Sequence, residues 1–125
     1  MKTILIVEDE RVIAEVFSAV LEDEGYRVLI ANNGKQGLDR LAEGQPDLVL
    51  CDVMMPGLDG RDVARAMSAS PRYRTIPLIL MSAALISVNK GEYPYAYFLR
   101  KPFDMDYLIE TVEKALNGSK PVRNG

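Results

Sequence analysis

Charged and polar side chains able to do chemistry follow the short apolar runs of this sequence. Glu8 and Asp9 come directly after the run "TILIV", and Asp52 closes the run "LVLCD". Ser82 follows "PLILM", and Lys101 follows "YAYFLR". A carboxylate is costly to bury unless a cation or a hydrogen-bond donor faces it. If the ends of these runs meet, three carboxylates, a hydroxyl and an ammonium group form one polar site.

Such a cluster favours a hard divalent cation. Carboxylates held together without a cation raise one another's pKa, and Lys101 offsets only one of the three charges. Mg²⁺ is typically held by one or two carboxylates, waters and a phosphate group. The acidic segment after the first run, with no GxGxxG motif, argues against a dinucleotide or flavin site. The chain has no histidine, which excludes His-based triads, most zinc sites and a phosphohistidine of its own.

The elements that must position these groups alternate between short apolar runs and longer amphipathic segments. Five strands are expected, at Thr3–Val7, Arg27–Ala31, a run starting at Leu48, Pro77–Met81 and Tyr95–Leu99. Helices are expected within Glu10–Tyr26, Gly34–Gly44, Gly60–Ser70 and Asp104–Gly118. Strands apolar on both faces, alternating with helices, indicate one doubly wound α/β domain whose parallel sheet has helices on both faces. In such sheets ligands bind at the carboxyl ends of the strands, where the predicted polar site lies.

Apolar spacing also predicts the buried faces of two helices. In the first helix, the inward residues are expected to be Val12, Ile13, Val16, Phe17, Val20 and Leu21, with Gly25 ending the helix. In the last helix, Asp104 is the expected N-cap and Gly118 lies just past the end. Its inward residues are expected to be Leu108, Ile109, Val112 and Leu116.

Composition indicates a soluble single domain. With 125 residues, 48% apolar and 26% charged, the chain can bury a sizeable core, and we expect a domain over residues 1–118 with a polar tail at 119–125. A net charge of −3 argues against nucleic acid as a partner. No apolar run approaches the roughly 20 residues of a membrane span. The single cysteine, Cys51, excludes an internal disulfide, fits the reducing cytoplasm, and is expected to be a small buried apolar residue.

Four motifs in order, "LIVEDE", "CDVMMPGLDG", "ILMSA" and "LRKPF", make the chain resemble the receiver domain of two-component response regulators. The resemblance covers residues 3–117 and is closest in kind to a stand-alone, chemotaxis-regulator-like receiver. It implies a flavodoxin-like sheet with strand order 2-1-3-4-5. It also implies a phosphorylation-activated switch that works with a sensor histidine kinase or phosphotransfer protein and a downstream protein target, as a monomer or weak dimer.

The resemblance gives each residue of the acidic cluster a role. Asp52 matches the aspartate that accepts a phosphoryl group from a partner's phosphohistidine. Glu8 and Asp9 match the acidic pair that holds Mg²⁺ together with Asp52 and the backbone carbonyl of Met54. Glu8 is one methylene longer than the aspartate often found at this position, so its metal affinity is expected to differ. Glu10 is expected to be only an N-terminal helix charge.

Three further residues match the remaining parts of the switch. Lys101 matches the lysine that contacts a phosphoryl oxygen, and Ser82 matches the hydroxyl that turns toward the phosphoryl group. Phe98 matches the aromatic whose rotamer reports activation, and it lacks the hydroxyl of the tyrosine that is frequent there. Because neither Met54 nor Ala84 can hydrogen-bond an attacking water, slow self-dephosphorylation is expected. The chain is expected not to be an enzyme, although it catalyses its own phosphoryl transfer.

One segment departs from the receiver pattern, and three other interpretations stay open. "LISVNKGEYPYAYF", Leu85–Phe98, is short and interrupted by Gly91 and Pro94, so a shortened, mobile or missing fourth helix is expected. The chain could be a degenerate receiver that binds partners without phosphorylation, or a fragment of a larger regulator in which "KPVRNG" begins a linker. A metal-dependent phosphohydrolase with an aspartyl nucleophile would need DxD, but Met54 occupies the second acidic position.

Overall fold

Five parallel strands form a single sheet at the centre of the protein. A computed structural model describes residues 1–84, 91 and 94–118. The sheet has the order β2-β1-β3-β4-β5, which confirms the predicted order. The strands are β1 (Thr3–Val7), β2 (Arg27–Ala31), β3 (Leu48–Asp52), β4 (Leu78–Ser82) and β5 (Tyr97–Arg100). β4 and β5 begin one and two residues later than predicted.

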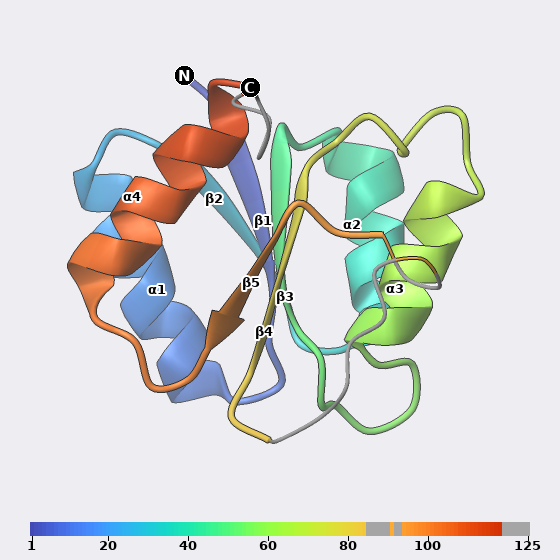
Figure 1. Cartoon of the computed structure of the whole chain (residues 1–125), viewed down its shortest axis with the longest axis horizontal. Coiled ribbons are helices and arrows are strands. Elements are labelled where there is room, and N and C mark those ends of the chain that lie inside the picture. Colours follow the sequence, from blue (N-terminus) through green and yellow to red (C-terminus); the bar gives the residue numbers. More distant parts are fainter. Residues whose placement is uncertain (85–90, 92–93, 119–125) are drawn as a thin grey trace.

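Helices cover both faces of the sheet, as predicted. They are α1 (Arg11–Asp23), α2 (Gly34–Gly44), α3 (Gly60–Ser68) and α4 (Met105–Leu116). α1 and α4 lie on one face, and α2 and α3 lie on the other (Figure 1). The unusual fourth helix predicted between β4 and β5 falls on residues 85–90 and 92–93, outside the described residues, and so does the predicted tail at 119–125. Among the described residues, no helix is both long and apolar enough to cross a membrane.

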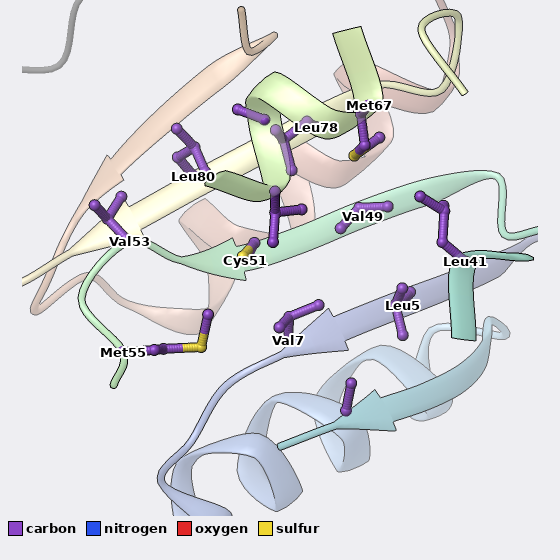
Figure 2. Close-up of a cluster of buried hydrophobic side chains, with 13 residues drawn as sticks. Leu5, Val7, Leu41, Val49, Cys51, Val53, Met55, Met67, Leu78 and Leu80 are labelled. Atoms are coloured by element: carbon purple, nitrogen blue, oxygen red, sulfur yellow. The ribbon is translucent and has the colours of Figure 1, made fainter. Parts of the chain in front are cut away.

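Alternating residues of the strands feed two separate hydrophobic cores. On β3, Val49 and Cys51 pack under α2 and α3, while Leu48 and Leu50 pack under α1 and α4. All four are fully buried. Figure 2 shows the first of these clusters, in which side chains of β1, β3 and β4 lie on one face of the sheet together with Met67 of α3. Because neighbouring side chains of a strand point to opposite faces, a strand buried on both faces must be apolar throughout.

The predicted inward face of α1 is partly wrong. Val12 and Val16 are exposed, at 72% and 47%, whereas the buried residues of the helix are Ala14, Phe17 and Leu21. At 100° per residue, the two valines lie on the side of the helix away from Ala14. The prediction counted only the large apolar side chains of the helix and left out Ala14, whose small side chain can face the sheet.

Local sequence signals set where the helices begin and end. Asp104 is the N-cap of α4, as predicted, and its side chain accepts a hydrogen bond from the Tyr107 N–H at 2.8 Å. Gly25 and Gly118 have positive φ just past the ends of α1 and α4, a conformation that favours glycine at a helix C-terminus. In α4, Leu108 and Val112 are buried as predicted, while Thr111 and Ala115 replace Ile109 and Leu116 as the other two buried residues.

Candidate functional site

The predicted polar residues meet at one edge of the sheet. Glu8 directly follows β1, Asp52 and Ser82 are the last residues of β3 and β4, and Lys101 directly follows β5. The strands are parallel and in register, with Asp52 beside Met81, so their carboxyl ends reach the same edge. The fold therefore brings these four strand-end residues to the same edge of the sheet.

Three carboxylates form a compact group there. One oxygen from each of Glu8, Asp9 and Asp52 lies within 4.8 Å of the others. Glu8 is fully buried and Asp52 is 7% exposed, while Asp9 is exposed. The second oxygen of Glu8 accepts a hydrogen bond from the Glu10 backbone N–H at 3.1 Å. Oxygen donors at this spacing, with one open side, suit a hard cation such as Mg²⁺.

Lys101 is shared between two of these carboxylates. Its Nζ lies 2.8 Å from Glu8 Oε1 and 3.7 Å from Asp52 Oδ2. The peptide bond between Lys101 and Pro102 is cis. With all groups ionised, three carboxylates and one ammonium carry a formal charge of −2. That charge matches a divalent cation, so the side chains present fit Mg²⁺.

Asp52 ionises less readily than an ordinary aspartate. Burial and then the Glu8 carboxylate raise its pKa from 3.8 to about 6, while Lys101 and a hydrogen bond from the Met54 backbone pull it down. This agrees with the expectation that clustered carboxylates raise one another's pKa. At pH 7 Asp52 is still mostly ionised and can act as a nucleophile.

Ser82 and Phe98 occupy different positions relative to the acidic group. Ser82 is fully buried at the end of β4, where its hydroxyl oxygen accepts a hydrogen bond from the Ala84 N–H at 3.1 Å and its carbonyl oxygen accepts one from the Lys101 N–H at 2.9 Å. Phe98 lies within β5, half-buried against the core under α3. Its ring centroid is 6.2 Å from that of Tyr95. Phe98 is thus set back from the strand ends.

The sequence prediction missed the cap that fixes the loop after β3. Asp59 is the N-cap of α3 and, with Asp62, forms a capping box. The signal was present in "DGRD", where an N-cap aspartate precedes a second acidic residue by three positions. This loop contains Met54, the residue whose carbonyl was predicted to face the metal.

Comparison with known proteins decides the family. A model of the response regulator receiver domain matches residues 4–113. The chain belongs to this family. The resemblance found in the four motifs is therefore confirmed.

Relatives of this receiver domain are found in several bacteria. The uncharacterized transcriptional regulatory protein YkoG of Bacillus subtilis is 42% identical over an alignment of 125 positions that covers 94% of this chain and 53% of YkoG. Protein PilH of Pseudomonas aeruginosa is 34% identical over an alignment of 121 positions that covers 94% of this chain and 100% of PilH. The chain thus spans about half the length of one relative and all of another.

A solved structure from the same bacterium as PilH matches the fold. It is the receiver domain of the sensor histidine kinase PA1611 of Pseudomonas aeruginosa, described with a magnesium ion coordinated in its active-site cleft. It is 28% identical to this receiver domain, with a TM-score of 0.84, and the alignment covers 93% of this chain and 98% of that one.

From the sequence, this chain is predicted not to be an enzyme, and it is also predicted to catalyse its own phosphoryl transfer and slow self-dephosphorylation. This combined prediction is wrong as stated. Its two halves conflict, because a domain that accelerates a reaction on its own aspartate is carrying out catalysis. The family match supports a receiver domain, a class of phosphoacceptors with autodephosphorylation, and it sets no slow rate.

Proposed function

We propose that this receiver domain accepts a phosphoryl group on Asp52 from a partner histidine kinase or phosphotransfer protein, in a Mg²⁺-dependent step, and then changes its protein-binding surface. One observation carries the proposal. The Asp52 carboxylate lies 3.7 Å from the Lys101 Nζ and groups with the carboxylates of Glu8 and Asp9. A nucleophile, a fixed positive charge and a cation site thus occupy one edge of the sheet.

The acidic group is the proposed metal site. Glu8, Asp9 and Asp52 would hold Mg²⁺ together with the backbone carbonyl of Met54. Bound there, Mg²⁺ would place positive charge beside the oxygens of the transferring phosphoryl group. The protein's own contribution is to fix the ligands in place before the donor arrives.

The side chains around Asp52 have separate roles in the proposed step. The Asp52 carboxylate attacks phosphorus and displaces the donor's histidine nitrogen. Lys101 holds a phosphoryl oxygen, for which its Nζ is already positioned between Asp52 and Glu8. Afterwards the Ser82 hydroxyl donates a hydrogen bond to the new phosphoryl group, and Phe98 moves into the space that Ser82 leaves. The resulting change on β5 would alter the surface that a downstream protein contacts.

A degenerate receiver is the second candidate, and a specific contact favours it. Lys101 lies closer to Glu8 than to Asp52 and makes a buried ion pair with it. That pair satisfies Glu8 without a cation, so the site could persist as a fixed structural cluster that only supports partner binding.

Phosphorylation of the intact protein separates the two candidates. The protein is incubated with Mg²⁺ and acetyl phosphate, and its intact mass is measured at intervals. We expect one added phosphoryl group that requires Mg²⁺ and is absent in Asp52→Asn. Asp39→Asn, on the exposed side of α2, serves as the matched control and should be labelled like the wild type. No label in wild type and control alike would favour the degenerate receiver.

A further inference from the structure

The loop between β3 and α3, residues 53–59, is pinned where it leaves the sheet and where it enters the helix. The Gly60 N–H donates a hydrogen bond to the Val53 carbonyl oxygen at 2.9 Å. A Cβ on Gly60 would lie 2.7 Å from the Asp52 carbonyl oxygen and 2.7 Å from Val53 Cα. Such distances are closer than real Cβ atoms approach, so only glycine lets the start of α3 pack on the end of β3.

The capping box fixes the last residue of the loop. Asp59 Oδ1 accepts hydrogen bonds from the N–H groups of Arg61 and Asp62 at 2.9 and 3.3 Å, and Asp62 Oδ2 accepts one from the Asp59 N–H at 2.9 Å. Arg61 also pairs with Asp59 Oδ2 at 2.8 Å. These contacts to both the backbone and the side chain of Asp59 fix the position of the last loop residue at the start of α3.

A third support comes from α2, which is distant in sequence from this loop. A Cβ on Gly34, the first residue of α2, would lie 2.3 Å from the Leu58 carbonyl oxygen and 2.7 Å from Leu58 Cβ. The atom nearest to it belongs to the backbone, so no side-chain rotation can relieve the contact. Because ordinary contact begins at 3.4 Å, any larger residue at position 34 must push Leu58 or α2 away by about 1 Å.

One residue in the middle of the loop, Met55, is fixed by packing, whereas its neighbour Met54 is exposed. The Met55 side chain is only 8% exposed and belongs to the core under α2 and α3 (Figure 2). With Met55 held in the core and Gly60 held on β3, a displacement of Leu58 changes the backbone between them. That backbone adjoins Met54, whose N–H hydrogen-bonds to the Asp52 carboxylate.

We propose that Gly34 is a positioning residue for the metal site. By allowing the first turn of α2 to rest against Leu58, it sets the loop that presents the Met54 backbone beside Asp52. The proposal rests on the proposed function, because it assumes that a divalent cation binds to Glu8, Asp9, Asp52 and the Met54 carbonyl. Gly34 touches neither cation nor phosphoryl group and acts through the loop. Its φ is not positive, so space rather than backbone conformation is what requires glycine.

Gly34→Ala tests this with Gly44→Ala as the matched control. Both change a glycine of α2 to alanine, but the Cβ at Gly44 would meet the end of the Leu29 side chain at 2.5 Å, which can rotate away. Mn²⁺ binding is measured by electron paramagnetic resonance, and the amide signal of Met54 is followed in the metal-free protein. We expect Gly34→Ala to weaken Mn²⁺ binding about tenfold or more and to move the Met54 signal. Gly44→Ala should stay within about twofold of wild type.

Equal Mn²⁺ affinity in wild type and Gly34→Ala would overturn the proposal, as would equal losses in the two alanine variants. Should Gly34→Ala not fold, a Mg²⁺ titration of the wild type decides. The amide signals of Gly34 and Leu58 must then shift with the same midpoint as that of Met54, and their failure to respond overturns the inference. Absence of Mn²⁺ binding in wild type and Gly44→Ala instead contradicts the proposed metal site itself.

Discussion

Asp52 is held where its charged form is disfavoured, and this has a cost in stability. Its pKa in the folded protein, about 6, lies above the 3.8 of an unperturbed aspartate, chiefly because of burial and the Glu8 carboxylate. Between these two pH values the folded state binds more protons than the unfolded state. The free energy of unfolding therefore falls as pH rises from about 4 to above 6. The stabilisation from a protonated Asp52 is complete below about pH 4 and is lost as pH rises through about 6.

Asp52→Asn should consequently stabilise the metal-free protein at neutral pH. Asparagine has no charge to desolvate beside Glu8, and its side-chain oxygen can still accept the hydrogen bond from the Met54 backbone. We expect a gain of up to about 3 kcal/mol at pH 8 that shrinks toward pH 4. Urea unfolding with a chelator at both pH values measures it, and Mg²⁺ should reduce the difference. A gain that is the same at pH 4 and pH 8 would contradict this origin.

That the candidate site residues lie at one edge of the sheet was predictable, because each stands at the end of a strand. Parallel strands send their carboxyl ends to one edge, so "EDE", Asp52, Ser82 and Lys101 had to gather once the strand order was right. The partner of Lys101 was not predictable. Whether its Nζ contacts Glu8 at 2.8 Å or Asp52 at 3.7 Å depends on side-chain rotamers and burial, which spacing along the chain does not encode.

At the scale of elements, the N-terminus of α3 does more than start a helix. The Asp59 side chain accepts hydrogen bonds from two backbone N–H groups of α3. Burial raises the pKa of Asp59, but hydrogen bonds from the Arg61 side chain and from the N–H groups of Asp62 and Arg61 lower it by more. Its pKa is therefore lowered. Stabilisation from the ionised side chain is present above its unfolded-state pKa near 3.8 and is lost as pH falls through the lower folded-state value.

Asp59→Ala should destabilise the protein by about 1 kcal/mol at pH 7, because a cap and an ion pair are lost together. Asp59→Asn should recover much of this loss, since asparagine also caps helices well. Thermal unfolding at pH 7 and at pH 3 gives both values, and the difference between wild type and Asp59→Ala should narrow at the lower pH. Asp39→Ala, which removes an exposed ion pair with Lys35, is the control and should change stability by at most about 0.5 kcal/mol. A larger loss in the control than in Asp59→Ala would refute the capping argument.

The bounds of the strands were predictable to within one or two residues, because their sequences are strongly apolar. β1 and β2 match the expected bounds, because short apolar or β-branched runs next to turn residues leave few alternatives. Which side of α1 is buried was harder to predict from the sequence. Val12 and Val16 are apolar yet exposed, while Ala14 is buried, and only the packing of α1 on the sheet distinguishes them.

At the scale of the whole molecule, the two cores depend on the same strands. Leu50 of β3 belongs to the core under α1 and α4, and Leu80 of the neighbouring β4 belongs to the core under α2 and α3. Both are fully buried, and Leu80 is paired across the ladder with Cys51, the residue after Leu50. Loss of one helical layer would expose one face of the sheet to water, so neither layer is expected to persist alone.

Leu50→Ala and Leu80→Ala therefore provide a matched test of cooperativity. Each removes the same side chain from an opposite face, and each should lower the free energy of unfolding by about 2–5 kcal/mol. Tyr97 packs against the core of Leu50 and Tyr73 against that of Leu80, so their ring signals report on the two layers separately. In urea, we expect both tyrosines to lose their native signals at the same midpoint in each variant, because a single domain of this size normally unfolds in one transition. If Tyr73 alone melted early in Leu80→Ala while Tyr97 kept its native signal, the layers would be independent, and a change at the strand ends could not reach both faces of the sheet.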